Sequence, residues 1–409
     1  MTARFALPAF AGYGLELEYM IVDRDSLAVR PIADALLPML QARRRPSAAL
    51  DWSNELVRHV VETKNVAPTP ELASLPELFV DDVRKANALL APMNARLMPT
   101  AMHPWMDPLT ETVLWEDETG VYGAYDGIYD CRGHGWANLQ SMHINLPFAS
   151  DAEFARLHAA IRLVLPLLPA LAASSPIADG AATGFMDYRL DAYFAICART
   201  PSVAGEIIPE TVESRAEYET RILAPMYAEI APYDPAGILR HEWLNSRGAI
   251  PRFDRNAIEI RLVDVQECPL ADVSIAAAVV TVVHWLYAEQ SASLVDQQAL
   301  ETGALAHVLR GTIRDAEDAI VDDAGYLRAL GIRADRCTAG DVWRALLDAA
   351  ARDAGLAGAW WQPALAAILE RGPLARRILR ATGERPSRRQ LRDVYEVLCD
   401  CLQHGRMFE

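Results

Sequence analysis

Residues 14–19, GLELEY, alternate apolar and acidic side chains. Side chains alternate across a β-strand, so the two leucines and Tyr19 would share one face of a strand, and Glu16 and Glu18 the other. A strand places two such carboxylates roughly 6–7 Å apart, a spacing at which each can hold its own metal ion. Taken alone, the pattern indicates an ordinary half-exposed strand more often than a metal site.

Three later segments repeat this alternation and carry polar residues in matching positions. The polar pairs are Glu62 and Lys64 in VVETK (60–64), His143 and Asn145 in SMHINL (141–146), and Glu259 and Arg261 in IEIRL (258–262). Each pair alone has an ordinary explanation as a solvated charge pair, a structural histidine or a surface ion pair. The recurrence is the informative feature, because four strands of one antiparallel sheet could point these groups the same way.

Such a sheet would gather four carboxylates and one imidazole on one face. The residues are Glu16, Glu18, Glu62, His143 and Glu259. This cluster would repel itself unless cations occupied it. Mg²⁺ and Mn²⁺ prefer carboxylate oxygen, and two or more ions bridging the phosphates of ATP would neutralise the charge that develops in phosphoryl transfer. Arg261, beside Glu259, would then meet a transferring phosphoryl group.

The distribution of patterns along the chain predicts an α+β fold. Up to about residue 270, short alternating segments mix with helical ones, and the remainder reads as mostly helix. We therefore expect a catalytic body over residues 1–270 and a helical C-terminal portion over residues 271–409 packed on it, unless the two form one continuous domain. Helices are expected at 75–93, 151–173 and 274–287.

Ser150 precedes one of these expected helices in the sequence Ser-Asp-Ala-Glu. A serine before a helix accepts a backbone N–H of the first turn, and a glutamate three residues later can return the contact. We expect Ser150 to be the N-cap and Glu153 to complete a capping box.

Composition excludes several classes of protein. A net charge of -16 and a pI near 5.1 argue against nucleic-acid or anionic-lipid partners. Lys64 and Lys85 are the only lysines, and neither follows a glycine as a GxxxxGK[ST] loop requires. The six scattered cysteines form no CxxC pair, which fits a reducing cytoplasm. The apolar run from Leu163 is short and interrupted by proline, so we expect no membrane span and no export.

The segments described so far, with two others, resemble the signature motifs of glutamate–cysteine ligase family 2 in the glutamine synthetase superfamily. The motifs are GLELEY, NELVRHVVETKN, SMHINLPF, SSPIADGAATGFMDYRLDAY and AIEIRLVDVQECP, in the family's order from about Gly12 to Pro269. The resemblance implies a glutamine-synthetase-like, curved and mainly antiparallel sheet with helices on one face. Five motifs in order are far more specific than any one of them.

The resemblance also implies roles for individual residues. The catalytic metals would be bound by Glu16, Glu18, Glu55, Glu62, His143 and Glu259. Arg261 would contact the nucleotide phosphates, and Arg189 would hold a substrate carboxylate or the phosphoryl group. Further candidates for nucleotide or anion contacts are Lys64, Asn145, Arg247, Arg252 and Arg255. Asn145 departs from the family, which commonly has a second histidine there, and asparagine carries no positive charge.

The implied activity is an ATP-dependent ligase that requires Mg²⁺ or Mn²⁺. A substrate carboxylate, glutamate being the family's choice, would attack the γ-phosphoryl group to give an acyl phosphate, and an amine would displace phosphate. Three alternatives stay open: a ligase for other amino acids or amines, a guanidino kinase of the same superfamily, and a non-catalytic nucleotide sensor, which Asn145 invites. The sequence leaves a homo-oligomer open and identifies neither substrate.

Overall fold

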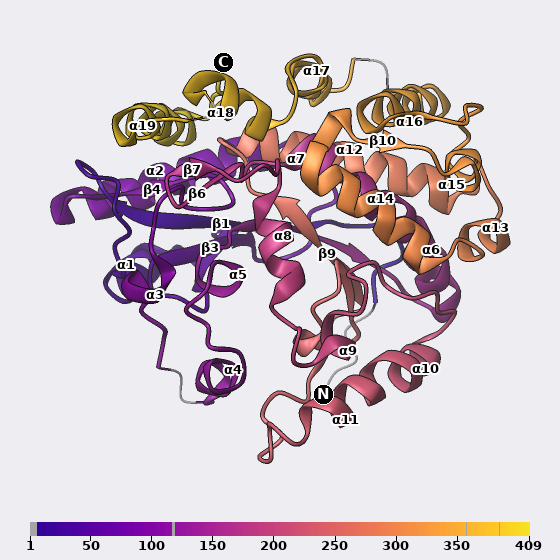
Figure 1. The fold of residues 1–409 in the computed structure, drawn as a ribbon, viewed down its shortest axis with the longest axis horizontal. Helices are drawn as coiled ribbons and strands as arrows, with labels where there is room; N and C mark the ends of the chain where they lie inside the picture. Colours follow the sequence, from indigo (N-terminus) through magenta and orange to yellow (C-terminus); the bar gives the residue numbers. More distant parts are fainter. Residues whose placement is uncertain (1–5, 117–118, 357, 384) are drawn as a thin grey trace.

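The computed structural model describes residues 6–116, 119–356, 358–383 and 385–409 (Figure 1). Within these residues, seven strands form one antiparallel sheet in the order β2-β3-β1-β5-β9-β8, with β4 paired to the second half of β1. The strands are β1 (Gly14–Asp23), β2 (Leu50–Asn54), β3 (Val60–Asn65), β4 (Ala95–Met98), β5 (Ser141–Pro147), β8 (Ala249–Arg252) and β9 (Ala257–Asp264). All four predicted strands are present, and they are neighbours as β3-β1-β5-β9.

Most of the remaining regular elements are helices. Those before residue 260 are α1 (Ala33–Arg43), α2 (Leu75–Leu90), η1 (Ala91–Met93), α3 (Pro108–Glu111), α4 (Val121–Tyr129), α5 (His134–Ala137), α6 (Asp151–Val164), η2 (Leu165–Leu167), α7 (Pro169–Ala172), α8 (Tyr188–Ala195), α9 (Pro201–Ala204), α10 (Arg215–Tyr218), η3 (Glu219–Leu223), α11 (Ala224–Ile230) and η4 (Glu242–Leu244). Those after it are α12 (Pro269–Tyr287), α13 (Leu294–Gln298), α14 (Thr302–Asp315), η5 (Ala316–Asp318), α15 (Ala324–Ala329), α16 (Ala339–Ala354), α17 (Gln362–Arg371), α18 (Leu374–Thr382) and α19 (Arg388–His404). Two small sheets pair β6 (Ile177–Ala178) with β7 (Ala181–Ala182) and β10 (Ile320–Val321) with β11 (Cys337–Thr338).

The apolar face of the sheet forms the main core. Leu15, Leu17 and Tyr19 of β1 are completely buried and belong to one cluster with Phe79 of α2 and Phe154 of α6. Burial of each such side chain contributes roughly 1.5–3 kcal/mol. Figure 1 shows the C-terminal helices, orange to yellow, along one side of the molecule, with α4, α10 and α11 on the opposite side. The expected α+β fold with an antiparallel sheet is confirmed.

The C-terminal portion also reaches the other face of the sheet at the far end of β1. A second apolar cluster joins Met20 and Val22 of β1 to α18 and α19, through residues that include Leu374, Ile378, Leu391 and Tyr395. Helix α12, which begins at residue 269, shares the main core with the strands of the first part. The division at residue 270 remains a prediction.

Helix α12 is long and apolar enough, by length and composition, to cross a membrane. It is a longer uninterrupted apolar segment than the run from Leu163 that stood out in the sequence. However, 78% of its most apolar window is buried, and the helix contacts α2, α6, α16 and α17. Packing in the core therefore accounts for its composition.

The start of α6 confirms one local prediction and corrects another. The Ser150 hydroxyl accepts the backbone N–H of Glu153 at 3.3 Å, as an N-cap does. The capping box is wrong, because the Glu153 carboxylate accepts the N–H groups of Ala149 at 2.8 Å and Ala9 at 2.9 Å. The carboxylate thereby ties the segment before β1 to the helix.

Candidate active site

Strand pairing brings the predicted polar residues side by side. The opposed residues are Glu16 with Lys64 and with His143, Glu18 with Glu62, and Asn145 with Glu259. Alternate residues of a strand share a face, so these side chains project from the face opposite the leucine core. A bulge, with one extra residue in β9, separates the pairs Met142–Val263 and Ile144–Ile260.

These side chains surround a cavity of about 500 Å³. Every residue proposed for the metal or anion contacts lines it, except Asn145 and Arg247. Asn145 instead donates from its amide to Glu16 Oε1 at 3.0 Å. Arg247 lies elsewhere, with two hydrogen bonds to Glu210 at 2.6 and 2.7 Å.

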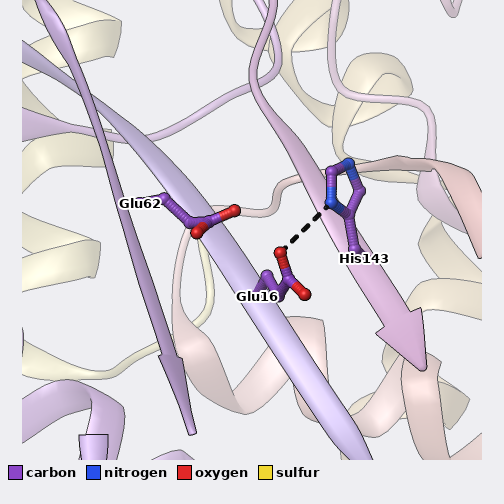
Figure 2. A group of neighbouring side chains, drawn as sticks. All are labelled: Glu16, Glu62 and His143. Carbon is purple, nitrogen blue, oxygen red and sulfur yellow. Dashed lines mark ion pairs between the residues drawn. The ribbon is translucent and has the colours of Figure 1, made fainter. Parts of the chain in front are cut away.

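Within the described residues, two acidic groups have ligand atoms close enough to share a cation. The first is Glu16, Glu62 and His143, and the second is Glu18, Glu55 and Glu62; within each group the atoms lie within 4.8 Å of one another. Figure 2 shows the first group, in which side chains from β1, β3 and β5 point toward one another. Glu62 belongs to both groups, which suits a pair of neighbouring ions.

Two serines that the sequence analysis did not single out hold this cluster in place. The Glu18 carboxylate accepts the Ser141 N–H at 2.7 Å and its hydroxyl at 3.2 Å, and the same hydroxyl lies 3.0 Å from His143 Nε2. The Ser53 hydroxyl donates to Glu62 Oε1 at 2.8 Å. The period-two rule could have found Ser141, which shares a face with His143, but Ser53 lies on β2, a strand that was not predicted.

The carboxylates of the cluster shift one another's protonation. Burial and the negative charge of Glu16 raise the pKa of Glu62 to about 7. Burial acts to raise the pKa of Glu16 as well, but its contact with His143 and the charge of that ring lower it overall. Burial alone would lower the pKa of His143, and its carboxylate neighbours raise it instead. Crowded oxygen donors with excess negative charge fit Mg²⁺ or Mn²⁺.

Two arginines flank Glu259 at the edge of the cluster. Arg261 Nε lies 3.0 Å from Glu259 Oε1, and an Arg252 Nη donates to Glu259 Oε2 at 3.3 Å. A backbone carbonyl, that of Asn245, accepts from Arg261 at 3.3 Å. Cationic groups therefore line the cavity beside the acidic groups, an arrangement suited to a polyphosphate that carries metal ions.

The other two arginines of the cavity differ in burial. Arg189 is buried, and its Nε donates to Asp264 at 2.5 Å, while its Nη2 has no hydrogen-bond partner among the described residues. Arg255 is exposed and lies 3.8 Å from Asp254. Arg189 is thus fixed by Asp264 and has one N–H group without a partner among the described residues, whereas Arg255 is exposed.

Aromatic side chains line another part of the cavity. They are Tyr122, Tyr125, Trp136, Tyr193 and Trp243, here called the aromatic wall. Trp136 reaches the cavity together with the preceding Gly135. Tyr193 is the last residue of the motif SSPIADGAATGFMDYRLDAY, whereas Tyr125 and Trp243 lie outside the motifs singled out in the sequence.

Comparisons with known proteins agree with this architecture. The family model of Glutamate-cysteine ligase family 2 matches residues 13–397. An uncharacterized protein of Archaeoglobus fulgidus is 35% identical over 269 residues, 64% of this chain and 72% of that relative. A candidate glutamate–cysteine ligase 2 of Bradyrhizobium diazoefficiens is 26% identical over 284 residues, 65% of this chain. The chain spans only 57% of the length of that ligase relative.

Solved structures share the fold at low sequence identity. A bifunctional glutathione synthetase from Pasteurella multocida superposes with a TM-score of 0.60 at 14% identity, over 97% of this chain and 53% of its own. A glutamate–cysteine ligase from Francisella tularensis in complex with AMP gives a TM-score of 0.60 at 13% identity, over 97% and 89%. The sequence match across nearly the whole chain, on this sheet and this acidic face, shows that the protein belongs to glutamate–cysteine ligase family 2.

Proposed function

We propose that this protein is an ATP-dependent ligase that joins a small-molecule carboxylate, such as glutamate, to an amine. The observation that carries the proposal is the single cavity in which two metal-compatible acidic groups, sharing Glu62, adjoin the arginine pair at Glu259. Phosphoryl transfer needs both features, because charge on the transferring group must be neutralised while its position is fixed.

Glu16, Glu62 and His143 would hold one metal ion, and Glu18 and Glu55 would complete a second site with Glu62. When bound, the ions would supply positive charge to the ATP phosphates. Glu259 stands in neither group, and we propose that it positions Arg261 and Arg252 rather than serving first as a ligand.

In the first half-reaction, a carboxylate oxygen of the substrate attacks the γ-phosphorus, and the bond to the β–γ bridging oxygen breaks to release ADP. Arg261 and Arg252 would stabilise charge on the transferring group. Arg189, fixed by Asp264 with one donor unused, would orient the substrate carboxylate. In the second half-reaction, the amine nitrogen bonds to the acyl carbon and the bond from that carbon to the phosphate oxygen breaks. Inorganic phosphate leaves and takes up the proton that the amine loses.

Lys64 and Asn145 act on the cluster itself in this structure. Lys64 donates to Glu62, and Asn145 donates to Glu16. We propose that Asn145 orients Glu16 in place of contacting the nucleotide. A cytoplasmic location and a homo-oligomer remain predictions.

ADP release tests the proposal, measured with Mg²⁺ and ATP against amino acids and amines given singly and in pairs, including glutamate with cysteine. Release that needs both a carboxylate and an amine is expected. Glu16→Gln should lower it by at least about 100-fold, because it removes a charged ligand at the reacting phosphates. Glu71→Gln, at an exposed position, is the matched control.

Three outcomes would contradict the proposal. Substantial activity in Glu16→Gln would contradict the assignment of Glu16 as a metal ligand. Release with one guanidino compound alone would make the protein a kinase. Tight ATP binding without ADP release for any pair would make it a nucleotide sensor.

A further inference from the structure

The aromatic wall is the part of the cavity that phosphoryl transfer leaves unexplained. Its five rings come from four elements: Tyr122 and Tyr125 from α4, Trp136 from α5, Tyr193 from α8 and Trp243 from η4. All five are only partly buried, although they sit beside the core. Five partly exposed rings in a cavity that also contains charged groups offer a surface for an apolar or flat group.

The rings are already assembled against one another. The Tyr125 ring centroid lies 5.3 Å from that of Trp136 and 5.9 Å from that of Trp243. Behind the wall, Tyr129 stacks on Trp136 at 5.2 Å and its hydroxyl is 2.7 Å from Thr200 Oγ1. A preformed surface binds a ligand without the entropic cost of ordering side chains.

A close approach of two helices fixes the position of Trp136. A Cβ atom at Gly135 would lie 2.4 Å from a methyl group of Ile196 and 2.8 Å from the carbonyl oxygen of Ala192. Only glycine lets α5 approach α8 this closely, so the neighbouring Trp136 is held where α8 supplies Tyr193 to the same wall.

The wall begins at the reacting end of the cavity. Helix η4, which carries Trp243, has Asn245 as its C-cap, and the Asn245 carbonyl accepts from Arg261 at 3.3 Å. Arg261 and the five rings line the same cavity. Arg261 adjoins Glu259 at 3.0 Å. The adenine of ATP lies at the far end of the triphosphate from the γ-phosphoryl group, so a wall that adjoins Arg261 suits the substrate rather than the base.

Of the two substrates, the amine gains most from such a surface. The carboxylate substrate must place its charge among arginines and metals, whereas an amine must be neutral to attack the acyl carbon. An apolar environment disfavours the ammonium form and so favours the nucleophilic amine. A small amine would leave much of the aromatic surface in water, at about 25 cal/mol for each Å² left unburied.

We infer that the aromatic wall binds the side chain of the amine substrate and selects an amine with an aromatic ring over a small or thiol-bearing one. The inference rests on the proposed ligase function, which supplies the need for an amine. The stacking of a ring on Tyr125 and Trp243 is the contact that discriminates.

Steady-state ADP release tests the inference, with glutamate and ATP fixed and the amine varied among tyramine, phenylethylamine, tyrosine, ethylamine and cysteine. We expect the ring-bearing amines to have KM values about tenfold below those of ethylamine and cysteine. Trp243→Leu and Tyr125→Leu should raise the KM for the ring-bearing amine about three- to tenfold and leave the KM for ATP unchanged. Tyr125→Phe keeps the ring and should have the wild-type KM for the ring-bearing amine. Trp360→Leu, at an exposed position, is the control.

Two results would overturn the inference while the ligase proposal stands. The first is equal KM values for cysteine and the ring-bearing amines. The second is a Trp243→Leu variant in which only the KM for ATP changes, which would assign the aromatic wall to adenine. Tryptophan fluorescence tests the ring site separately if no activity is found. If no pair releases ADP, the ligase proposal fails. Quenching by tyramine that Trp243→Leu abolishes would then support the ring site by itself, and no quenching would overturn it as well.

Discussion

Single side chains set the charge state of the candidate active site, and Glu62 is the clearest case. It lies at the overlap of the two acidic groups, accepts from Ser53 and Lys64, and lies close to Glu16. Lys64 brings one positive charge to the cluster of Glu16, Glu18, Glu55 and Glu62, and the Ser53 hydroxyl brings none, so protons or other cations must balance the remaining negative charge. Glu62 is the position at which this competition can be measured.

Glu62 contributes to the pH dependence of stability in the metal-free protein. Its pKa in the folded state is raised from 4.5 to about 7 by burial and by Glu16. The unfolded chain releases this proton at lower pH than the folded protein does, so stability falls as pH rises through that window. Mg²⁺ competes with the proton, and we expect it to raise the Tm by several degrees more at about pH 8 than at about pH 6. Thermal unfolding with and without Mg²⁺ measures this difference.

Glu62→Gln supplies the check. The amide cannot ionise, so in the variant the fall in stability with pH should become smaller and most of the Mg²⁺ effect should be lost, while Glu71→Gln should keep both in full. An unchanged Mg²⁺ effect in Glu62→Gln would mean that the ion binds elsewhere.

At the scale of elements, strand β9 matters most, because it carries both Glu259 and Arg261. It is held by β5 on one side and β8 on the other, and its bulge faces His143 on β5. The approach to β8 depends on a glycine. A Cβ atom at Gly248 would lie 2.5 Å from a methyl group of Leu262, and the Gly248 carbonyl accepts the Arg261 N–H at 2.9 Å.

Gly248→Ala should therefore cost about 1–3 kcal/mol of folding stability through overpacking, and it should lower kcat by moving Arg261. Denaturant unfolding and ADP release measure the two effects. Gly303→Ala in α14 is the matched control, because a Cβ there meets nothing within 4 Å, and it should be neutral or stabilise by up to about 1 kcal/mol. If the two variants behave alike, close packing at Gly248 is not what holds β9 in place.

At the scale of the whole molecule, a buried ion pair fastens the C-terminal helices to the catalytic sheet. Arg377 of α18 donates to Glu267, which follows β9, and to the carbonyl of Phe408 at 2.7 Å. Glu267 also accepts the Phe408 N–H at 3.2 Å and is completely buried. The C-terminal tail, α18 and the end of β9 therefore meet at one carboxylate.

Arg377→Ala should lower the free energy of unfolding by about 3–5 kcal/mol, because it leaves Glu267 buried and without its cationic partner. Arg389→Ala, whose side chain is 91% exposed, removes a surface contact and should change it by less than about 0.5 kcal/mol. Urea denaturation compares the two. An equal change in the free energy of unfolding for the two variants would show that the C-terminal portion unfolds independently of the Arg377–Glu267 contact.

The four central strands, their polar face and the family could be predicted from the amino-acid sequence alone. Alternation at period two is local information, so Glu16, Glu18, Glu62 and His143 could be assigned to one face without knowing the strand order. The N-cap contact of Ser150 also joins residues that are close in the sequence, so it could be predicted. The contact of Glu153 with Ala9 could not, because Ala9 lies in the segment before β1.

The contacts between distant segments could not be predicted from the sequence, because they depend on how the chain packs in three dimensions. Ser141 holds Glu18 across a separation of 123 residues, and Asn145 turned to Glu16 across 129, so neither contact follows from spacing. Arg247 shares a segment with Arg252 yet pairs with Glu210 away from the cavity. The aromatic wall joins rings from four helices, none of which has a periodic signal that points to the others. Periodicity fixes which face a side chain takes, but packing between distant segments fixes its neighbours, and the chemistry of this cavity depends on both.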